Sequence, residues 1–203
     1  MTWKEVLQTT GGRWAMFFCL ATAAIMVFYV PDFYQNTIAP KKGPILDDAF
    51  LNLFNPFDCS IAIFTILYLA VIQTLVLGLK RPSVMMLGIT TYCAVSLLRM
   101  ASMYLVTLEP PTGMILLIDP ISSSLYPDNN FAKDLFFSGH VSTMMILVLL
   151  DGNKTTKWLK IVGTSIMGLF LAWQHVHYTI DLVVAPVVTY VVFAQIRRIL
   201  DLT

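Results

Sequence analysis

The residues of this chain best suited to chemistry are its three histidines, which fall in two short motifs. His140 closes the run Ser138-Gly139-His140, and the run from His175 to Asp181 reads His-Val-His-Tyr-Thr-Ile-Asp. His177 and Asp181 are four residues apart, so on a helix they would share one face, where the carboxylate can accept a hydrogen bond from the imidazole. That bond would fix the tautomer and present the other ring nitrogen as a nucleophile or a base.

The composition indicates that a membrane protein must position these motifs. Of the 203 residues, 57% are hydrophobic and 12% are charged, whereas a soluble domain carries about 25% charged residues. The net charge of +1, without a basic stripe, argues against nucleic-acid binding. Cys19, Cys59 and Cys93 lie in or beside apolar runs with no metal-ligand spacing, so we expect small buried residues rather than a disulfide framework.

Six apolar segments are candidates for membrane-spanning helices, each of which needs about 20 residues to cross a bilayer core of about 30 Å. They are Trp14–Val30, Phe57–Leu79, Ser83–Val106, Leu135–Leu150, Trp158–Trp173 and Val176–Ile196. The first also fits a cleaved signal peptide, but its small residues lie inside the apolar run, which favours an uncleaved helix. With no repeat or linker, we predict an all-α integral membrane protein of one domain with six transmembrane helices.

The distribution of Lys and Arg predicts the orientation of these helices. With the N-terminus inside, nine of the 13 basic residues fall on the inner face: Lys4, Arg13, Lys80, Arg81, Lys154, Lys157, Lys160, Arg197 and Arg198. The two long connections, Asp32–Pro56 and Thr107–Lys133, then lie outside. Both termini are therefore predicted to be cytoplasmic.

This topology gathers four ionisable groups from three helices in the outer leaflet. They are Arg99, His140, His177 and Asp181, and we expect no comparable group deep in the inner half. Ionisable side chains inside a membrane span are costly and usually mark a functional interior. We therefore predict a site on the non-cytoplasmic face.

Each of these residues also has a plain structural interpretation. A histidine at a helix end often caps carbonyl groups or lies at the water interface, which is our expectation for His175. Ser138 and Gly139 fit a helix N-cap and turn, and Asp181 could be an ion-pair partner of Arg99. A metal site is a rival for His ligands and a carboxylate, but a His–Asp pair fits orientation at least as well. No metal is predicted.

Taken as chemistry, the four groups favour a substrate with an anionic centre. An arginine offers a planar fork to phosphate oxygens. One histidine can attack phosphorus while the second gives or takes a proton at the leaving or entering oxygen. A phospho-histidine would divide one difficult displacement into two easier ones. Because the site faces the membrane interface, the predicted substrate is a lipid phosphate or phosphodiester.

The two motifs resemble the active-site motifs of the type 2 phosphatidic acid phosphatase (PAP2) superfamily, and more closely those of its sphingomyelin synthase branch. The first motif of that branch reads Asp-x-x-x-Ser-Gly-His, matched here from Asp134 to His140. The second reads His-x-His-Tyr-Thr-Ile-Asp, matched from His175 to Asp181. The run from Arg99 to Leu108 is similar to the Arg-rich segment at the end of that branch's third helix.

The resemblance implies a PAP2-like bundle that transfers a phospho-headgroup from a membrane phospholipid to a lipid alcohol, such as ceramide or diacylglycerol. It implies no cofactor, metal or nucleotide. His177 would be the nucleophile that forms the phospho-enzyme, Asp181 its orienter, and His140 the acid–base residue. The residues expected to bind substrate are Arg99, Asp134, Ser138, Gly139 and Tyr178.

The chain departs from the phosphatase branch, which carries an arginine five residues before its nucleophilic histidine, where this chain has Ala172. This favours the transferase branch and leaves phosphate binding to Arg99 and Lys133. Two alternatives remain: a lipid phosphatase or phospholipase C-like hydrolase that uses the same residues with water as acceptor, and a non-enzymatic lipid binder or transporter, although no transporter-type repeat is seen.

The headgroup, phosphocholine or phosphoethanolamine, is left open by the sequence, as is the oligomeric state. An aromatic cage would suit choline, and acidic groups such as Asp134 and Glu109 could meet either cation. The aromatic candidates near the outer face are Tyr104, Tyr126, Phe131, Phe136, Phe137 and Tyr178.

Overall fold

The computed structural model describes residues 2–119, 133 and 135–200, and within these residues the chain is helical, with no β-strand. The long helices are α2 (Thr10–Phe28), α4 (Ser60–Gly78), α5 (Pro82–Leu105), α7 (Gly139–Leu150), α8 (Lys154–Trp173) and α9 (Thr179–Leu200). Four short elements accompany them: α1 (Trp3–Gln8), α3 (Val30–Phe33), the π-helix η1 (Tyr34–Ile38) and the 3₁₀ turn η2 (Leu51–Leu53). The predicted all-α fold is confirmed for the described residues.

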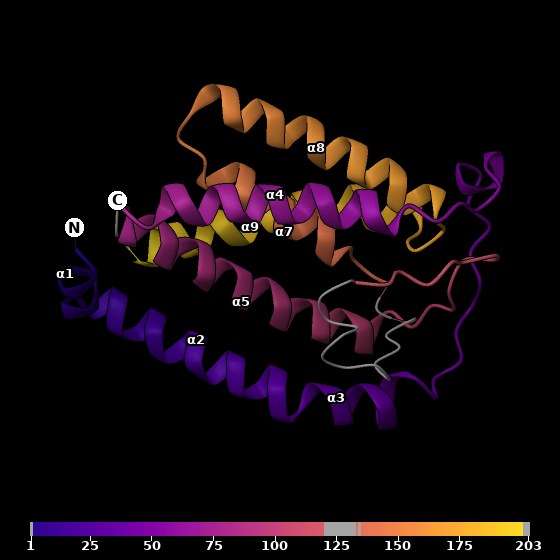
Figure 1. Cartoon of the computed structure of the whole chain (residues 1–203). Helices are drawn as coiled ribbons and strands as arrows, with labels where there is room; N and C mark the ends of the chain where they lie inside the picture. Colours follow the sequence, from indigo (N-terminus) through magenta and orange to yellow (C-terminus); the bar gives the residue numbers. More distant parts are fainter. Residues whose placement is uncertain (1, 120–132, 134, 201–203) are drawn as a thin grey trace.

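Helix α7 lies within the bundle and packs against α4, α5, α8 and α9. The main core contains Ile63, Val95, Met144, Met167 and Ala185, one from each of these five helices. Helix α2 packs on α5 and α9, on the side of the bundle away from α8 (Figure 1). The motif-bearing helices α7 and α9 are thus in direct contact with each other within the bundle.

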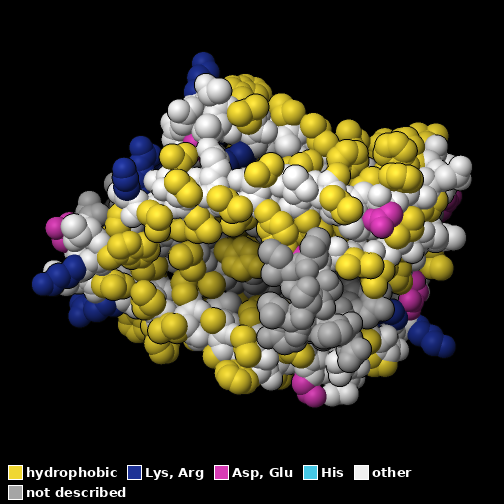
Figure 2. Space-filling view, in the orientation of Figure 1, with side chains coloured by type: hydrophobic (Ala, Val, Ile, Leu, Met, Phe, Trp, Pro, Cys, Tyr) yellow, Lys and Arg dark blue, Asp and Glu magenta, His cyan; other side chains and the backbone are white. Residues whose placement is uncertain are grey.

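Four helices of the described chain, α2, α4, α5 and α9, are long and apolar enough to cross a membrane by length and composition. Hydrophobic side chains cover most of the visible surface between the two ends of the bundle (Figure 2). Helix α7 is apolar but has only 12 residues, about 18 Å. Helix α8 has 20 residues and begins with a Lys-containing turn. The chain is an integral membrane protein, and six helices occupy the positions of the six predicted segments.

The ends of the described chain and the long connections lie at opposite ends of the bundle (Figure 1). Helix α9 starts at the end with the long connections and runs back to Leu200, which packs in one cluster with Val6 of α1. The two histidine motifs therefore lie far from both termini along the bundle axis.

The first segment does not stop at Pro31 as the sequence suggested. After α2 ends at Phe28, helical turns continue through α3 and η1 to Ile38. Pro31 occupies the first turn of α3, where its missing N–H interrupts no hydrogen bond. The predicted outer connection therefore begins with helical turns, and Tyr34 and Ile38 are buried beside Met103 of α5.

Several predicted helix starts differ from the structure by a few residues, and two of these differences fall on the histidine motifs. Residues 135–138 precede α7 as non-helical chain, and residues 174–178 form a turn before α9 in which His175 has a φ of 56°. His177 therefore lies before the helix rather than on its face. Tertiary hydrogen bonds, described below, hold both stretches away from helical geometry.

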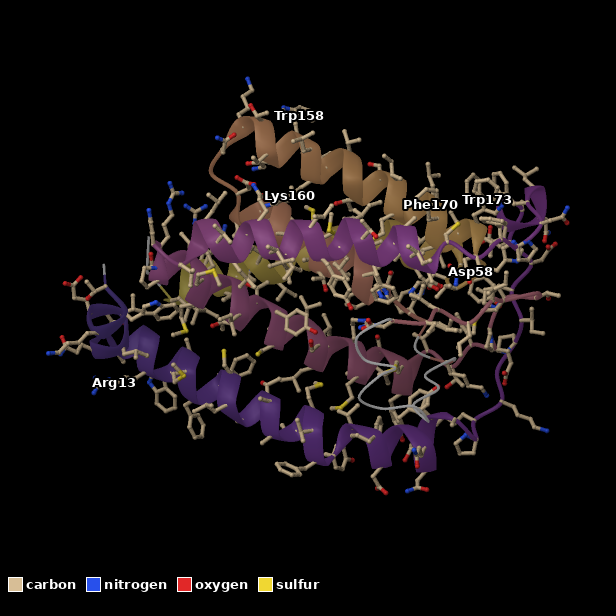
Figure 3. All side chains as sticks on the ribbon, in the orientation of Figure 1. Arg13, Asp58, Trp158, Lys160, Phe170 and Trp173 are labelled. Carbon is tan, nitrogen blue, oxygen red and sulfur yellow. The ribbon has the colours of Figure 1, made fainter. Side chains whose placement is uncertain are left out.

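The structure also contains a buried ion pair that the sequence did not indicate. Lys160, predicted to lie on the inner face, is buried on α8, where its Nζ is 2.8 Å from Asp151 Oδ2 and 2.7 Å from Thr74 Oγ1 (Figure 3). Asp151 ends α7, so this pair joins α4, α7 and α8 at the end remote from the histidines. Charge-based topology rules count a lysine without recognising that it is paired.

Candidate active site

The two motifs meet directly through their main chains. The N–H of Ser138 donates to the carbonyl oxygen of Asp181 at 3.2 Å. Ser138 is also the N-cap of α7, where its Oγ accepts the Val141 N–H. The start of α7, and with it His140, is therefore attached to the first turn of α9. The juxtaposition expected from the sequence is present in the structure.

Asp181 is fully buried at the start of α9. Its Oδ2 accepts the N–H of Tyr178, the residue just before the helix, at 3.0 Å. This is the back-bond of a helix capping motif, and the helix N-terminus favours the negative charge. The carboxylate is thus fixed in place by the turn that carries His177.

His177 is 2% exposed, and its Nδ1 lies 3.5 Å from Asp181 Oδ2. This distance is an ion-pair contact, but its geometry does not make a hydrogen bond, and Nδ1 and Asp181 Oδ1 have no hydrogen-bond partner among the described residues. Catalytic hydrogen bonds are often long before substrate binds. With Nδ1 directed at the carboxylate, Nε2 is the ring nitrogen available to a substrate.

His140 is the second residue of α7 and is partly buried. Its ring and that of Phe64 of α4 form an edge-to-face pair, with ring centroids 5.6 Å apart at 75°. Phe64 in turn stacks on Tyr68, whose hydroxyl donates to Asp119. The imidazole therefore packs against a pair of aromatic side chains from α4.

Arg99 of α5 packs closely against the start of α7. Its Nε donates to the carbonyl oxygen of Phe137 at 2.9 Å. A Cβ placed on Gly139 would lie 2.1 Å from Arg99 Nη1, so the guanidinium occupies space that only a glycine leaves open. Ser102, one turn along α5, donates to the Phe136 carbonyl. These contacts hold residues 135–138 in a non-helical path and place a cation at the helix start, against Gly139.

Tyr178, predicted to bind substrate, is buried and ties two connections together. Its hydroxyl donates to the Glu109 carbonyl oxygen at 2.9 Å and accepts the Leu46 N–H at 3.1 Å. Burial raises the pKa of this phenol. The Tyr178 side chain therefore holds the loops that carry Leu46 and Glu109 against the start of α9.

Asp48, which sequence reasoning left without a role, caps α9 from the first long connection. Its two oxygens accept the Thr179 N–H at 2.7 Å and the Thr179 hydroxyl at 2.9 Å. Burial raises the pKa of Asp48, but hydrogen bonds from Thr179, Leu51 and Phe50 outweigh that effect, so the net shift is below its ordinary value. Because the two partners are 131 residues apart, no local sequence pattern predicts this cap.

The turn between α8 and α9 is held by Gln174 and His175, both buried. The Gln174 amide accepts the Cys59 N–H at 3.0 Å and donates to Ser60 Oγ at 3.0 Å. His175 Nδ1 lies 2.8 Å from the Thr112 carbonyl oxygen, so it carries the hydrogen of that contact. His175 was expected at the water interface, and its burial instead makes it part of the turn that presents His177.

Other residues that the sequence suggested for phosphate or headgroup binding make contacts within the protein. Lys133, a candidate phosphate ligand, pairs with Glu109 at 2.9 Å, and this hydrogen bond lowers the pKa of Glu109. Phe137 is buried, and Lys41 lies 3.6 Å above the Tyr104 ring. Asp134, Tyr126 and Phe131 lie outside the described residues. Among the described residues, no three His, Cys, Asp or Glu side chains group as metal ligands would.

The fold and site define an integral membrane protein with a buried His–Asp pair beside a second histidine and an arginine. Residues 133–199, which include both motifs, match the family model described as PAP2 superfamily C-terminal. This match supports membership of the PAP2 superfamily and a function of the lipid phosphatase or phosphotransferase type. No curated protein and no solved structure matches the chain.

Proposed function

We propose that this protein transfers a phospho-headgroup, of the phosphocholine or phosphoethanolamine type, from a glycerophospholipid to a lipid alcohol such as ceramide or diacylglycerol. The observation that carries the proposal is the direct attachment of the His140 helix to the His177–Asp181 pair through Ser138 and Asp181. This attachment supports the proposal that His140 and His177 act together in a two-step transfer.

In the first step, the Nε2 lone pair of His177 attacks the donor phosphorus. A phosphorus–nitrogen bond forms as the bond to the diacylglycerol oxygen breaks, and protonated His140 gives its proton to that oxygen. Asp181, with Oδ2 facing Nδ1, stabilises the positive charge that develops on the ring. In the second step, His140 removes the proton of the acceptor alcohol, whose oxygen attacks phosphorus and releases His177.

The phosphate oxygens would be held by the Arg99 guanidinium and the N-terminus of α7. The contact between Arg99 and Gly139 puts the cation against the first turn of that helix, where unpaired N–H groups and the helix dipole favour an anion. Asp134 is the candidate for recognition of the headgroup cation, whereas the Glu109 carboxylate already pairs with Lys133. This arrangement requires no metal or nucleotide.

A hydrolase that uses the same residues is the second candidate, because the family match covers phosphatases as well as transferases. Water would then replace the acceptor alcohol. The low exposure of His177, 2%, supports transfer over hydrolysis because a phospho-histidine there would meet little bulk water.

The decisive experiment follows labelled headgroup phosphate. Purified protein would be given a mixture of donor phospholipids with ceramide or diacylglycerol, and the lipid and aqueous products would be separated. We expect label to appear in a new lipid, whose identity shows which headgroup was transferred. The His177→Ala variant should form no such product. Label only in water would replace the transferase with the hydrolase. No turnover with any common headgroup would favour a lipid binder.

We also propose that the termini are cytoplasmic and the site faces outward, on the strength of the Lys and Arg distribution. In sealed vesicles of known orientation, a cysteine introduced at Lys42 should react with a membrane-impermeant reagent from the non-cytoplasmic side. One introduced at Lys157 should react only after permeabilisation. The reverse pattern would invert the topology.

A further inference from the structure

A groove of about 320 Å³ runs between α4 and α5, with α7 as its floor. Figure 2 shows a hollow in the hydrophobic surface, in the region where α4 and α5 pass each other in Figure 1. Its lining is almost entirely apolar: Val71, Thr74, Leu75, Met85, Gly88, Ile89, Tyr92, Thr143, Ile146, Leu147 and Leu150. Ile89 and Tyr92 are exposed on the lipid-facing surface of α5, so the groove opens sideways.

The outer end of the groove adjoins the candidate active site. Thr143 lies three residues after His140 on α7, about one helical turn deeper. From Thr143 to Leu150 the groove follows α7 for about 10 Å away from the histidines. A molecule whose phosphate lies beside His140 would therefore have the groove directly below it.

The threonines that line the groove have their hydrogen bonds within the protein. The Thr143 hydroxyl donates to the Gly139 carbonyl oxygen at 2.8 Å, and the Thr74 hydroxyl accepts Lys160 Nζ while donating to Ala70. Neither needs a partner from an occupant. The lining therefore suits a hydrocarbon chain rather than a sugar, peptide or second headgroup.

Two close contacts lie at the inner end of the groove. Met85 reaches across from α5 to Gly78 of α4, where an added Cβ would lie 2.2 Å from its Sδ. Leu150 occupies the space beside Gly88 of α5, and its Cδ1 would lie 2.5 Å from a Cβ added there. The Met85 contact joins α4 to α5, and the Leu150 contact joins α5 to α7, so together they form an inner stop.

We propose that this groove holds one hydrocarbon chain of the lipid substrate and that Met85 limits the length of chain it accepts. The proposal deepens the proposed function and rests on it for the position of the phosphate. If each methylene occupies about as much space as a water molecule, roughly 30 Å³, the groove holds on the order of ten of them. A longer chain must displace Met85, and overpacking of that kind lowers binding about tenfold or more.

The kinetic test uses donor lipids that share a headgroup and differ only in chain length. Met85→Ala should move the length at which kcat/KM falls toward longer chains, and Ile89→Trp should move it toward shorter ones. Val187→Trp, on an exposed position of α9 outside the groove, is the matched control and should leave the profile unchanged. Identical length profiles for wild type, Met85→Ala and Ile89→Trp would overturn the proposal.

A photolabelling measurement separates this proposal from the proposed function. A phospholipid with a photoreactive group at the end of one chain should label α4, α5 or α7 near Met85, and Ile89→Trp should reduce that labelling several-fold. Such labelling without any headgroup product would uphold the groove and refute the transferase and hydrolase. Headgroup turnover with labelling only elsewhere would uphold the enzyme and refute the groove.

Discussion

The main-chain N–H of Ser138 and the main-chain carbonyl oxygen of Asp181 are 3.2 Å apart, although the two residues are more than 40 positions apart in sequence. Because the contact uses backbone atoms, it fixes the position of α7 relative to α9 without depending on either side chain. The Asp181 carboxylate remains available to His177 and to the Tyr178 N–H. Asp181 therefore aligns the two helices through its backbone and, in the proposed mechanism, orients His177 through its side chain.

Asp181→Asn should reduce kcat by about three to four orders of magnitude while leaving the fold intact. The amide oxygen can still accept the Tyr178 N–H, but the side chain no longer carries the charge that stabilises a positive His177. Steady-state turnover together with unfolding temperature would measure the two effects separately. Unchanged turnover would remove Asp181 from the mechanism, and a large loss of stability would assign it a structural role.

Gly139→Ala should impair phosphate binding, because its Cβ would occupy the position of the Arg99 guanidinium. We expect KM for the donor lipid to rise about tenfold or more, as for a misplaced binding group. Gly168→Ala on α8 is the matched control, since an added Cβ there meets no atom within 4 Å. Equal kinetics for the two variants would contradict a role for the Arg99–Gly139 contact.

The Asp48 cap predicts a pH dependence of stability. Hydrogen bonds keep the pKa of Asp48 below its ordinary value of 3.8 in the folded protein. The folded state therefore binds this proton less readily than the unfolded state, and the cap stabilises the fold fully above about pH 4. That contribution should be lost as pH falls through the lowered pKa. Unfolding temperatures measured from neutral to acid pH should fall less steeply for Asp48→Asn than for wild type.

Tyr178→Phe should lower stability by about 1–3 kcal/mol, since it leaves the Leu46 N–H and the Glu109 carbonyl without their partner. Turnover should fall only modestly if Tyr178 acts through the loops. Chemical denaturation and kcat/KM on the same preparation would show this. A loss of turnover by several orders of magnitude at unchanged stability would instead indicate direct contact with substrate.

Replacing only Lys160 of the buried Lys160–Asp151 pair should destabilise the protein more than replacing both residues. Lys160→Met alone would leave the Asp151 carboxylate buried without its cation and should cost about 3–5 kcal/mol. The double replacement of Lys160 by Met and Asp151 by Leu should recover much of that loss, because no buried charge remains. A double-mutant cycle of unfolding free energies would reveal the coupling. Strictly additive losses would show that the pair does not act as a unit.

Much of the architecture could be predicted from the chain. Long apolar runs bounded by Lys-Arg-Pro or Asp-Gly-Asn leave few choices for the helices, and α4 and α5 begin and end within a few residues of their predicted bounds. The convergence of the two histidine motifs also followed from topology. These features depend on local composition and on the length needed to cross a membrane.

Other features depend on distant partners and could not be predicted in the same way. Residues 135–138 are apolar enough to lengthen α7, yet hydrogen bonds to Arg99, Ser102 and Asp181 keep them out of helical geometry. The placement of His177 before α9 follows from the Asp181 back-bond and the Asp48 cap. The burial of Lys160 required knowledge of where Asp151 would lie. In each case a specific polar partner, often far along the chain, overrides the local pattern.

The placement of the chain ends has a practical consequence for handling the protein. The described N- and C-terminal residues lie at the end of the bundle away from His140 and His177 (Figure 1). An affinity tag or fluorophore on either end would therefore anchor the molecule by the face remote from its chemistry. Protein captured on a chip or bead in this way would present its histidines to added lipid, so single-molecule turnover could be followed without obstruction by the support.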